Sequence, residues 1–570
     1  MTPTLNIKVN GSYLELPPEF ALGIDLINPL TAEGVNISLF NYPATIPNSH
    51  ANARAFGYPG TVELAATVNV FESHTAELEL DGTLILRGNI TISQATEKEI
   101  SIYFRDQLGT LKDNIENKTL RDLEFEEINL LDYSADIVEA ADLIANGTDD
   151  NRPLCFPPFY IELHDTFSAI VANDFDPINN THEGQGETTF IPCSYVKHVL
   201  AQIFTDEGFS VTSDFFSDAQ WKRLFIHNTR SLMHGGTGNP PANYPIRYIF
   251  PDLIEMQVHP EKHLPQLKLV AFLSELKRLF NLAIDFNRLL PQAEMISWKE
   301  IESADEREDW TALAAPEPLV EEPEYNGVVR SHKEDDGNEL VTDKVLDVST
   351  LTQLAAVNTV ADLPTVVGNE GKVCLVKGID QWYIVQESEW IFYSFNIQPA
   401  TDGNREDEIE NEMCQLPMTE HATPNSPWAA YKYKMAQLAF SYEEMPQVLK
   451  GDFNLRLMFY YGFKLEKTGT YYVPLAAVDE NNQAGGNIGD WCLHWSGDRG
   501  LFTTFWESFY RMIAFKPVTY PVRMDLKTLL NFSYKKFITI RGQKLFIKRI
   551  RLQLPRLDKT VVEFYKVPEA

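Results

Sequence analysis

The chain has 570 residues and a formal net charge of −33, and apolar residues make up 44% of it. At roughly 150 residues per domain this length predicts about four domains, and the apolar content excludes wholesale disorder. Acidic residues outnumber basic ones by 81 to 48, which excludes sequence-independent binding of nucleic acid because phosphate groups would be repelled.

The cysteines and the N-terminus indicate a cytoplasmically made protein. The five cysteines lie far apart and form no C-x-x-C pair: Cys155, Cys193, Cys374, Cys414 and Cys492. We therefore expect reduced thiols rather than a disulfide framework or a zinc knuckle. Residues 1–16 lack the basic and apolar segments of a signal peptide, and no run of about 18 apolar residues predicts a membrane span.

Residues 1–135 are predicted to form an N-terminal β domain. Apolar and polar residues alternate in 5–9 and 98–104, and Asn10-Gly11 and Asp81-Gly82 separate pairs of such runs. These dipeptides are the strongest short hairpin signal, since both turn residues must adopt positive φ. Residues 39–60 are rich in Pro, Asn and Gly, which predicts a long projecting loop without regular structure.

The period changes in residues 136–301, which are predicted to form an α+β middle region. Apolar residues recur at helical spacing after Ser194, a predicted N-cap, and stop at Gly208. A second helical pattern covers 267–282, and short strands follow at 283–286 and 294–299.

An acidic segment and a small module come next. Residues 302–349 carry many acids and several prolines and predict a linker or exposed strands. Residues 350–397 predict a β insertion with strands Val373–Val376, Trp382–Val385 and Trp390–Phe392. The module's aromatic residues Trp382, Tyr383 and Trp390 are candidate contacts to a glycan or a partner, although such residues more often form cores and subunit contacts.

Residues 398–570 are predicted to form a C-terminal β domain with one buried helix over 499–515. Alternating patterns predict strands over 432–442, 453–463, 469–478, 515–525, 537–554 and 560–567. The last fifty residues carry 12 basic and four acidic side chains, a charge of +8, so the first 520 carry −41. This asymmetry favours neighbours that meet head to tail with opposite charge.

The motifs that would carry chemistry are incomplete. His259 and His263 stand four residues apart, but Pro260 occupies the position where a zinc hydrolase needs its glutamate. No G-x-S-x-G elbow accompanies the glycines after His234, and residues 368–372 are too short for a phosphate-binding loop. We therefore predict no catalytic, cofactor-binding or metal-binding residue, no cofactor and no enzymatic activity.

Several stretches, taken in chain order, resemble one known family. They are residues 38–59, 76–92, 191–216, 225–232, 264–286, 361–395, 500–513 and 524–550. Together they resemble the tail-hub or baseplate-hub proteins of tailed bacteriophages, especially phages that infect Bacteroidetes. In that family a Pro/Asn-rich segment precedes a strand pair with a central Asp-Gly, as at residues 38–59 and 76–92 here.

The resemblance implies an α+β, mainly β chain whose N- and C-terminal regions form β-barrel-like tube domains around the middle region and the small β insertion. It implies a trimeric hub ring that continues the tail tube, with tube or distal tail proteins above and a spike or tip protein below. Phage DNA would pass an acidic lumen without specific binding. The chain would be assembled in the host cytoplasm and reside in the virion, and any wall-cutting activity would belong to a partner.

Two other functions stay open at this point. A carbohydrate-binding host-recognition protein of the tail tip would use the tryptophans of residues 350–397. A hydrolase of cell wall or polysaccharide would rest only on the abundant carboxylates and aromatic residues, which single out no pair.

Overall fold

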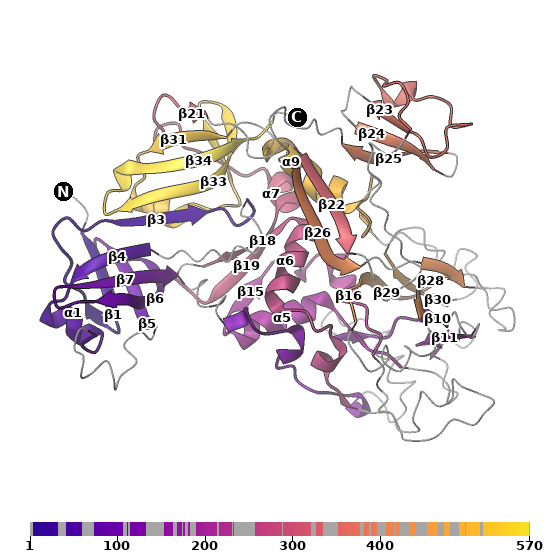
Figure 1. The fold of residues 1–570 in the computed structure, drawn as a ribbon, viewed down its shortest axis with the longest axis horizontal. Coiled ribbons are helices and arrows are strands. Elements are labelled where there is room, and N and C mark those ends of the chain that lie inside the picture. The colour runs from indigo at the N-terminus through magenta and orange to yellow at the C-terminus, as the bar shows by residue number, and fades with distance from the viewer. Residues whose placement is uncertain are drawn as a thin grey trace.

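The computed structural model places most of the chain in β structure (Figure 1). It describes residues 4–31, 42–59, 73–106, 111, 114–132, 153–163, 168–173, 175–176, 181–182, 190–213, 216–230, 232, 257–287, 289–320, 327–333, 352–376, 381–386, 389–395, 406–414, 418–421, 433–440, 453–465, 472–478, 489–495, 498–513 and 517–568. Within these ranges strands clearly outnumber helices, which confirms the mainly β class.

The N-terminal region forms a six-stranded sheet in the order β2-β1-β5-β6-β7-β4, drawn in indigo and violet in Figure 1. Its strands are β1 Leu5–Val9, β2 Ser12–Tyr13, β4 Tyr42–Pro47, β5 His74–Leu80, β6 Thr83–Ala95 and β7 Glu99–Asp106. Both predicted hairpin turns are confirmed, because Asn10 and Gly11 have φ of 48° and 83°, and Asp81 and Gly82 have φ of 51° and 74°.

The prediction of a loop without regular structure over 39–60 was wrong for the described residues. They form the strand β4 and the helix α1, His50–Ala55. Prolines are tolerated in β4 because it is the edge strand of its sheet, where a missing N–H interrupts no ladder. The helix begins at Ser49, whose hydroxyl accepts a hydrogen bond from the Asn52 N–H.

The C-terminal region forms a seven-stranded sheet in the order β20-β32-β33-β34-β31-β21 with one added strand, β3, and its strands β31 to β34 are yellow in Figure 1. Its strands are β3 Leu22–Ile27, β20 Arg307–Asp309, β21 Leu319–Val320, β31 Val518–Val522, β32 Phe537–Ile540, β33 Gln543–Leu554 and β34 Thr560–Lys566. Figure 1 shows the indigo strand β3 lying along the yellow sheet, where it pairs antiparallel with β33. The two sheets share one hydrophobic core, which contains Ile7, Leu78, Ile102, Trp310, Ile538 and Phe564.

The two sheets repeat one topology. The order β1-β5-β6-β7-β4 of the first sheet matches β20-β32-β33-β34-β31 of the second. In each, a short capped helix follows the last strand of that order, α1 after β4 and α10 (Leu526–Asn531) after β31. In each, a turn with two positive φ values, Asp81-Gly82 or Arg541-Gly542, leads into the longest strand. One pairing differs, because β1 is antiparallel to β5 whereas β20 is parallel to β32.

A middle body with its own hydrophobic core lies beside the two sheets, and Figure 1 labels its helices α5, α6 and α7. Its helices are α5 Val196–Asp206, α6 Leu269–Phe280, α7 Trp298–Ala304 and α9 Glu507–Ile513, the last preceded by a π-helical turn over Phe502–Trp506. Its strands include β15 Ser210–Thr212, β16 Leu224–Ile226, β18 Leu282–Phe286, β19 Gln292–Ser297, β29 Leu457–Leu465 and β30 Tyr472–Ala477. The helices predicted around 196–206, 269–280 and 502–513 are confirmed.

One detail of the first predicted helix was wrong. Its N-cap is Tyr195, whose carbonyl accepts from the N–H groups of His198 and Val199. Ser194 instead lies in β14, Cys193–Ser194, which pairs with β9, Leu154–Cys155. The helix therefore starts where strand pairing ends, one residue later than side-chain capping predicts. Its predicted stop is confirmed, because Gly208 follows the C-cap with φ of 76°.

Further paired strands complete the described structure. They are β8 Ile128–Asn129, β10 Phe159–Leu163, β11 Ser168–Ala172, β12 Phe175–Asp176, β13 Thr181–His182, β17 Gln257–Val258, β22 Gly327–Lys333, β26 Glu406–Cys414, β27 Met418–His421 and β28 Tyr433–Phe440. Single 3-10 turns cover Leu120–Asp122, Leu130–Asp132, Trp221–Arg223, Pro260–His263, Val360–Asp362 and Leu557–Lys559. The predicted domain boundaries at 135, 301, 349 and 397 stay predictions.

The small module is an antiparallel three-stranded meander of β23 Val373–Val376, β24 Gln381–Gln386 and β25 Glu389–Phe395. These strands confirm the three predicted in residues 350–397. Figure 1 shows the meander projecting from the rest of the molecule.

Candidate functional site

The three aromatic residues predicted as contacts lie on two neighbouring strands of the module. Tyr383 is on β24 and Trp390 on β25, where Trp390 lies opposite the fully buried Val385. Since side chains alternate along a strand, Tyr383, Val385 and Trp390 share one face of the meander. The Trp390 indole N–H donates to the Pro364 carbonyl at 2.6 Å. Both side chains thus take part in the packing of the module.

Tyr383 lies in a negative environment. Burial raises the pKa of its hydroxyl, and the negative charges of Asp498 and Glu507 raise it further. The side chain of Trp382 falls outside the described residues. A glycan or partner contact through these three residues therefore stays a prediction.

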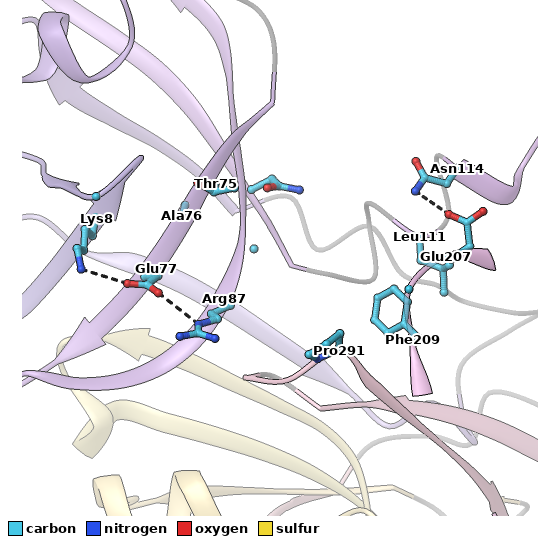
Figure 2. Close-up of a pocket in the computed structure, with 14 residues that line it drawn as sticks. Lys8, Thr75, Ala76, Glu77, Arg87, Leu111, Asn114, Glu207, Phe209 and Pro291 are labelled. Atoms are coloured by element: carbon cyan, nitrogen blue, oxygen red, sulfur yellow. Dashed lines mark hydrogen bonds and ion pairs between the residues drawn. The ribbon is translucent and has the colours of Figure 1, made fainter. Parts of the chain in front are cut away.

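Sequence reasoning missed a cavity of about 540 Å³ between the N-terminal sheet and the middle body. Figure 2 shows its two walls facing each other. The sheet contributes Lys8, Glu77 and Arg87, and the opposite wall includes Glu207 and Phe209. No sequence pattern signalled it, because its walls come from segments far apart in the chain.

The charges of this cavity are balanced on each wall separately. Glu77 forms ion pairs with Lys8 at 3.5 Å and with Arg87 at 3.3 Å. Glu207 pairs with Lys118 and accepts a hydrogen bond from the Asn114 amide at 2.8 Å. The hydrogen bond and charge of Glu207 raise the pKa of Lys118.

The charged side chains of the cavity are engaged in contacts with the protein itself. Both carboxylates are held by cations, and no serine, cysteine or histidine is among the described lining residues. Arg87 also donates to the Leu289 carbonyl at 3.3 Å, so one side chain bridges the sheet and the middle body. The polar contacts thus join the sheet to the middle body at this cavity.

Buried titratable groups of the middle body serve its structure. His263 ends a 3-10 turn and shares hydrogen bonds with Asn228 and the Arg230 carbonyl, and burial lowers its pKa to about 3. Lys277 on α6 donates to the Pro29 carbonyl at 2.7 Å, and burial lowers its pKa to about 7. Lys277 thereby ties the middle body to the segment that follows β3.

The remaining candidate motifs give no site in the described part of the chain. All five cysteines are buried thiols without a disulfide. Among the described residues, no group of three or more His, Cys, Asp or Glu side chains could hold a metal ion. No helix in the ranges described above is long and apolar enough to cross a membrane. The glycines after His234 lie outside the described residues.

Sequence reasoning also missed the repeat of the two sheets, although a signal was present. Each half carries a capping residue, Ser49 or Asp525, and then an X-Gly turn before a long alternating run. The helix cap, the turn and the long strand recur in the same order in both halves. Because the residue types differ between the halves, the sequence shows no obvious repeat.

Comparisons with known proteins were made at the level of sequence and of structure. No family model and no curated protein matches the sequence. Among solved structures, a tail protein from Neisseria meningitidis MC58 is similar over 100% of this chain and 97% of its own, with 10% identity and a TM-score of 0.28. A 43 kDa tail protein of prophage MuSo2 from Shewanella oneidensis is similar over 99% and 96%, with 8% identity and a TM-score of 0.31. Likeness at this level carries no conclusion about this chain.

Proposed function

We propose that the chain is a structural, non-enzymatic component of a phage tail tip or baseplate. In this proposal it forms a hub ring that continues the tail tube and connects it to the spike or tip. The observation that carries the proposal is the repeat of the two sheets within one chain. The resemblance of the sequence to phage tail-hub proteins supports it.

The resemblance implies that three hub chains continue a six-fold tail tube, and a repeated β unit suits such a ring. Each chain supplies two units of the same topology, so three chains supply six similar units. Head-to-tail contacts between such units generate a closed ring if the rotation closes. The N- and C-terminal β regions then act as the two tube domains of each chain.

Ring closure would also protect the sheet edges. Open edges expose unpaired backbone N–H and C=O groups to other chains, and closed assemblies remove them. In the described residues, β2 and β4 end one sheet and β20 and β21 end the other.

The charge distribution suits passage of DNA. With a net charge of −33, an acidic lumen would let DNA slide, since every retained phosphate contact would hold the duplex. The partners in this proposal are tube or distal tail proteins above the ring and a spike or tip protein below it. The assembled protein resides in the virion.

The first experiment measures the mass of the purified full chain by analytical ultracentrifugation and images the same sample in negative stain. We expect a species of three times 64.9 kDa that appears as a ring with a central hole. Mass spectrometry of purified tailed particles should find the chain among their components. A protein that stays monomeric and is absent from particles contradicts the proposal.

A second candidate function is carbohydrate binding by the 350–397 module at the tail tip. The projection of the meander in Figure 1 favours a contact outside the chain, and Tyr383, Trp390 and Trp382 would contribute to it. Deleting residues 350–397 from the full chain should then abolish binding on a glycan array and reduce adsorption. Unchanged adsorption and a silent array would exclude this candidate.

A further inference from the structure

Two cysteines of the middle body face each other across a pair of strands. β14 pairs antiparallel with β9, and in this register Cys193 lies directly opposite Cys155. Directly opposite residues of an antiparallel pair point to the same face. Both cysteines are fully buried, and the Cys155 thiol donates to the Cys193 carbonyl oxygen at 3.6 Å. The fold thus brings together two thiols that are 38 residues apart in the chain.

The spacing of these strands suits a covalent bond between the two sulfurs. The Tyr195 N–H donates to the Pro153 carbonyl at 3.0 Å, so these two residues form a hydrogen-bonded pair. Pair types alternate along an antiparallel ladder, so Cys155 and Cys193, two residues further on, form the same type, with Cα atoms about 5.5 Å apart. A disulfide spans Cα separations of about 4.4–6.8 Å. The two strands therefore already stand at the separation that a disulfide needs.

Burial keeps both thiols protonated while the strands are closed. It raises the pKa of Cys193 to about 12 and that of Cys155 well above its ordinary value. The attacking species in thiol–disulfide exchange is the thiolate, so the closed structure protects the pair. β9 and β14 are each two residues long, and local opening of this short pair exposes both sulfurs. We expect the rate of exchange to follow that opening.

A bond at this place would connect parts of the middle body that the chain itself links only by a long detour. The segment between the two cysteines contains β10, β11, β12 and β13. β14 is followed by Tyr195, the N-cap of the core helix α5. The bond would therefore close this segment into a loop and tie the start of α5 to β9. Closing a loop lowers the entropy of the unfolded chain and so stabilises the folded one.

We propose that Cys155 and Cys193 are a redox pair that forms a reversible disulfide with a low-molecular-weight disulfide, such as oxidised glutathione, as the oxidant. One protein thiolate attacks a glutathione sulfur, and a mixed disulfide forms as the first glutathione thiolate leaves. The second protein thiolate then attacks the protein sulfur of the mixed disulfide and displaces the second glutathione. Two protein thiols are oxidised, one glutathione disulfide is reduced, and the two thiol protons end on the two glutathiones.

The medium around the protein would set the state of this pair. The cytosol keeps such thiols reduced, and extracellular media favour the disulfide. The Cβ atoms of cross-strand partners are about 4.5–5.5 Å apart, wider than the about 3.5–4.5 Å of a relaxed disulfide, which makes the bond easier to reduce. This inference goes beyond the proposed function and does not depend on the ring.

The first test identifies the bond. The full native chain is incubated with oxidised glutathione at mildly alkaline pH, and a second sample is refolded from urea in the same buffer, where access to the thiols is not limiting. We expect the free thiols to fall from five to three, and peptide mass spectrometry to find Cys155 linked to Cys193. Cys492→Ser is the matched control and should keep this link. Refolded protein in which this link is absent, or no more frequent than other cysteine pairs, overturns the proposal.

The second test measures what the bond does to the folded protein. We expect the oxidised chain to melt about 4 °C or more above the reduced one. Excess dithiothreitol added to the folded protein should remove this difference. In Cys155→Ser the oxidising buffer should leave the melting temperature unchanged. A linked protein that melts below the reduced one would show that the fold does not accommodate the bond and would overturn the proposal.

Discussion

The N-terminal and C-terminal sheets have the same strand order, but their long strands β6 and β33 differ in the neighbouring strands with which they pair. On β33 the second half of the strand is covered by β3, which comes from more than five hundred residues earlier in the chain. The corresponding part of β6 has no such partner in the described residues. Among the described strands, one copy of the topology thus receives a strand from the other end of the chain and the other copy does not.

A second difference concerns the residue that directly follows the strand β1 or β20. Trp310, directly after β20, is fully buried and contacts the ring of Phe564 edge-on, with 6.2 Å between the centroids. The residue directly after β1, Asn10, is an exposed turn residue. The β3–β33 pair also carries an ion pair between Arg549 and Asp25, whereas residues 91–95 of β6 are uncharged. The C-terminal sheet thus has a buried aromatic residue and an ion pair that stabilise it at these two places.

Removing the Trp310 side chain should have the largest effect on this comparison. Trp310→Ala leaves a large cavity in the shared core and should lower the free energy of unfolding by about 3–5 kcal/mol. Urea unfolding followed by circular dichroism measures it. Trp310→Phe, which keeps most of the volume and loses an indole N–H without a hydrogen-bond partner, should cost clearly less. Equal losses in both variants would show that the cavity is not the cause.

Weakening β3 should come next. Ile24→Ala removes buried volume where the added strand meets β33 and should lower the free energy of unfolding by about 2–4 kcal/mol. Leu26→Ala, at a half-buried position of the same strand, should cost less. Limited proteolysis should then cut near β3 sooner in Ile24→Ala. A smaller effect for Ile24→Ala than for Leu26→Ala would contradict the assigned burial.

The two X-Gly turns should respond equally. Gly82 and Gly542 have φ of 74° and 81°, and a Cβ at either would meet no atom within 4 Å. Alanine is therefore opposed only by backbone strain, which costs about 1–2 kcal/mol. Thermal unfolding of Gly82→Ala and Gly542→Ala measures it. A loss in one turn only would show that the turns are not equivalent.

The two helix caps should give the smallest change and differ in pH dependence. Ser49→Ala and Asp525→Ala each remove a side-chain acceptor at a helix N-terminus and should cost about 1 kcal/mol at neutral pH. Hydrogen bonds from Thr528 lower the pKa of Asp525, so its contribution is present above the ordinary pKa and is lost as the pH falls through the lowered one.

Unfolding of both cap variants and the wild type at neutral and strongly acidic pH tests this difference. The effect of Asp525→Ala should shrink in acid, whereas that of Ser49→Ala should not change. An Asp525→Ala effect that is independent of pH would mean that its carboxylate does not cap the helix.

The candidate sites show which features the pattern of the sequence predicts and which it does not. The sequence placed Tyr383 and Trp390 on strands of a small meander, and their strands are as predicted. The cavity beside Glu77 and Glu207 could not be predicted, because its walls meet only after the sheet has docked on the middle body. The exposed Leu319 and Val320 lie in an acidic, proline-containing segment that predicts a linker or exposed strands.

The sequence by itself determined the local elements of this protein. Asn10-Gly11 and Asp81-Gly82 specify tight turns, and helical spacing specifies the helices around Leu200 and Leu276, because these signals depend only on neighbouring residues. The tertiary structure alone decided that β3 joins β33 and that prolines fit in β4. Both depend on which sheet edge is free after distant segments have paired, and strand periodicity carries no information about that choice.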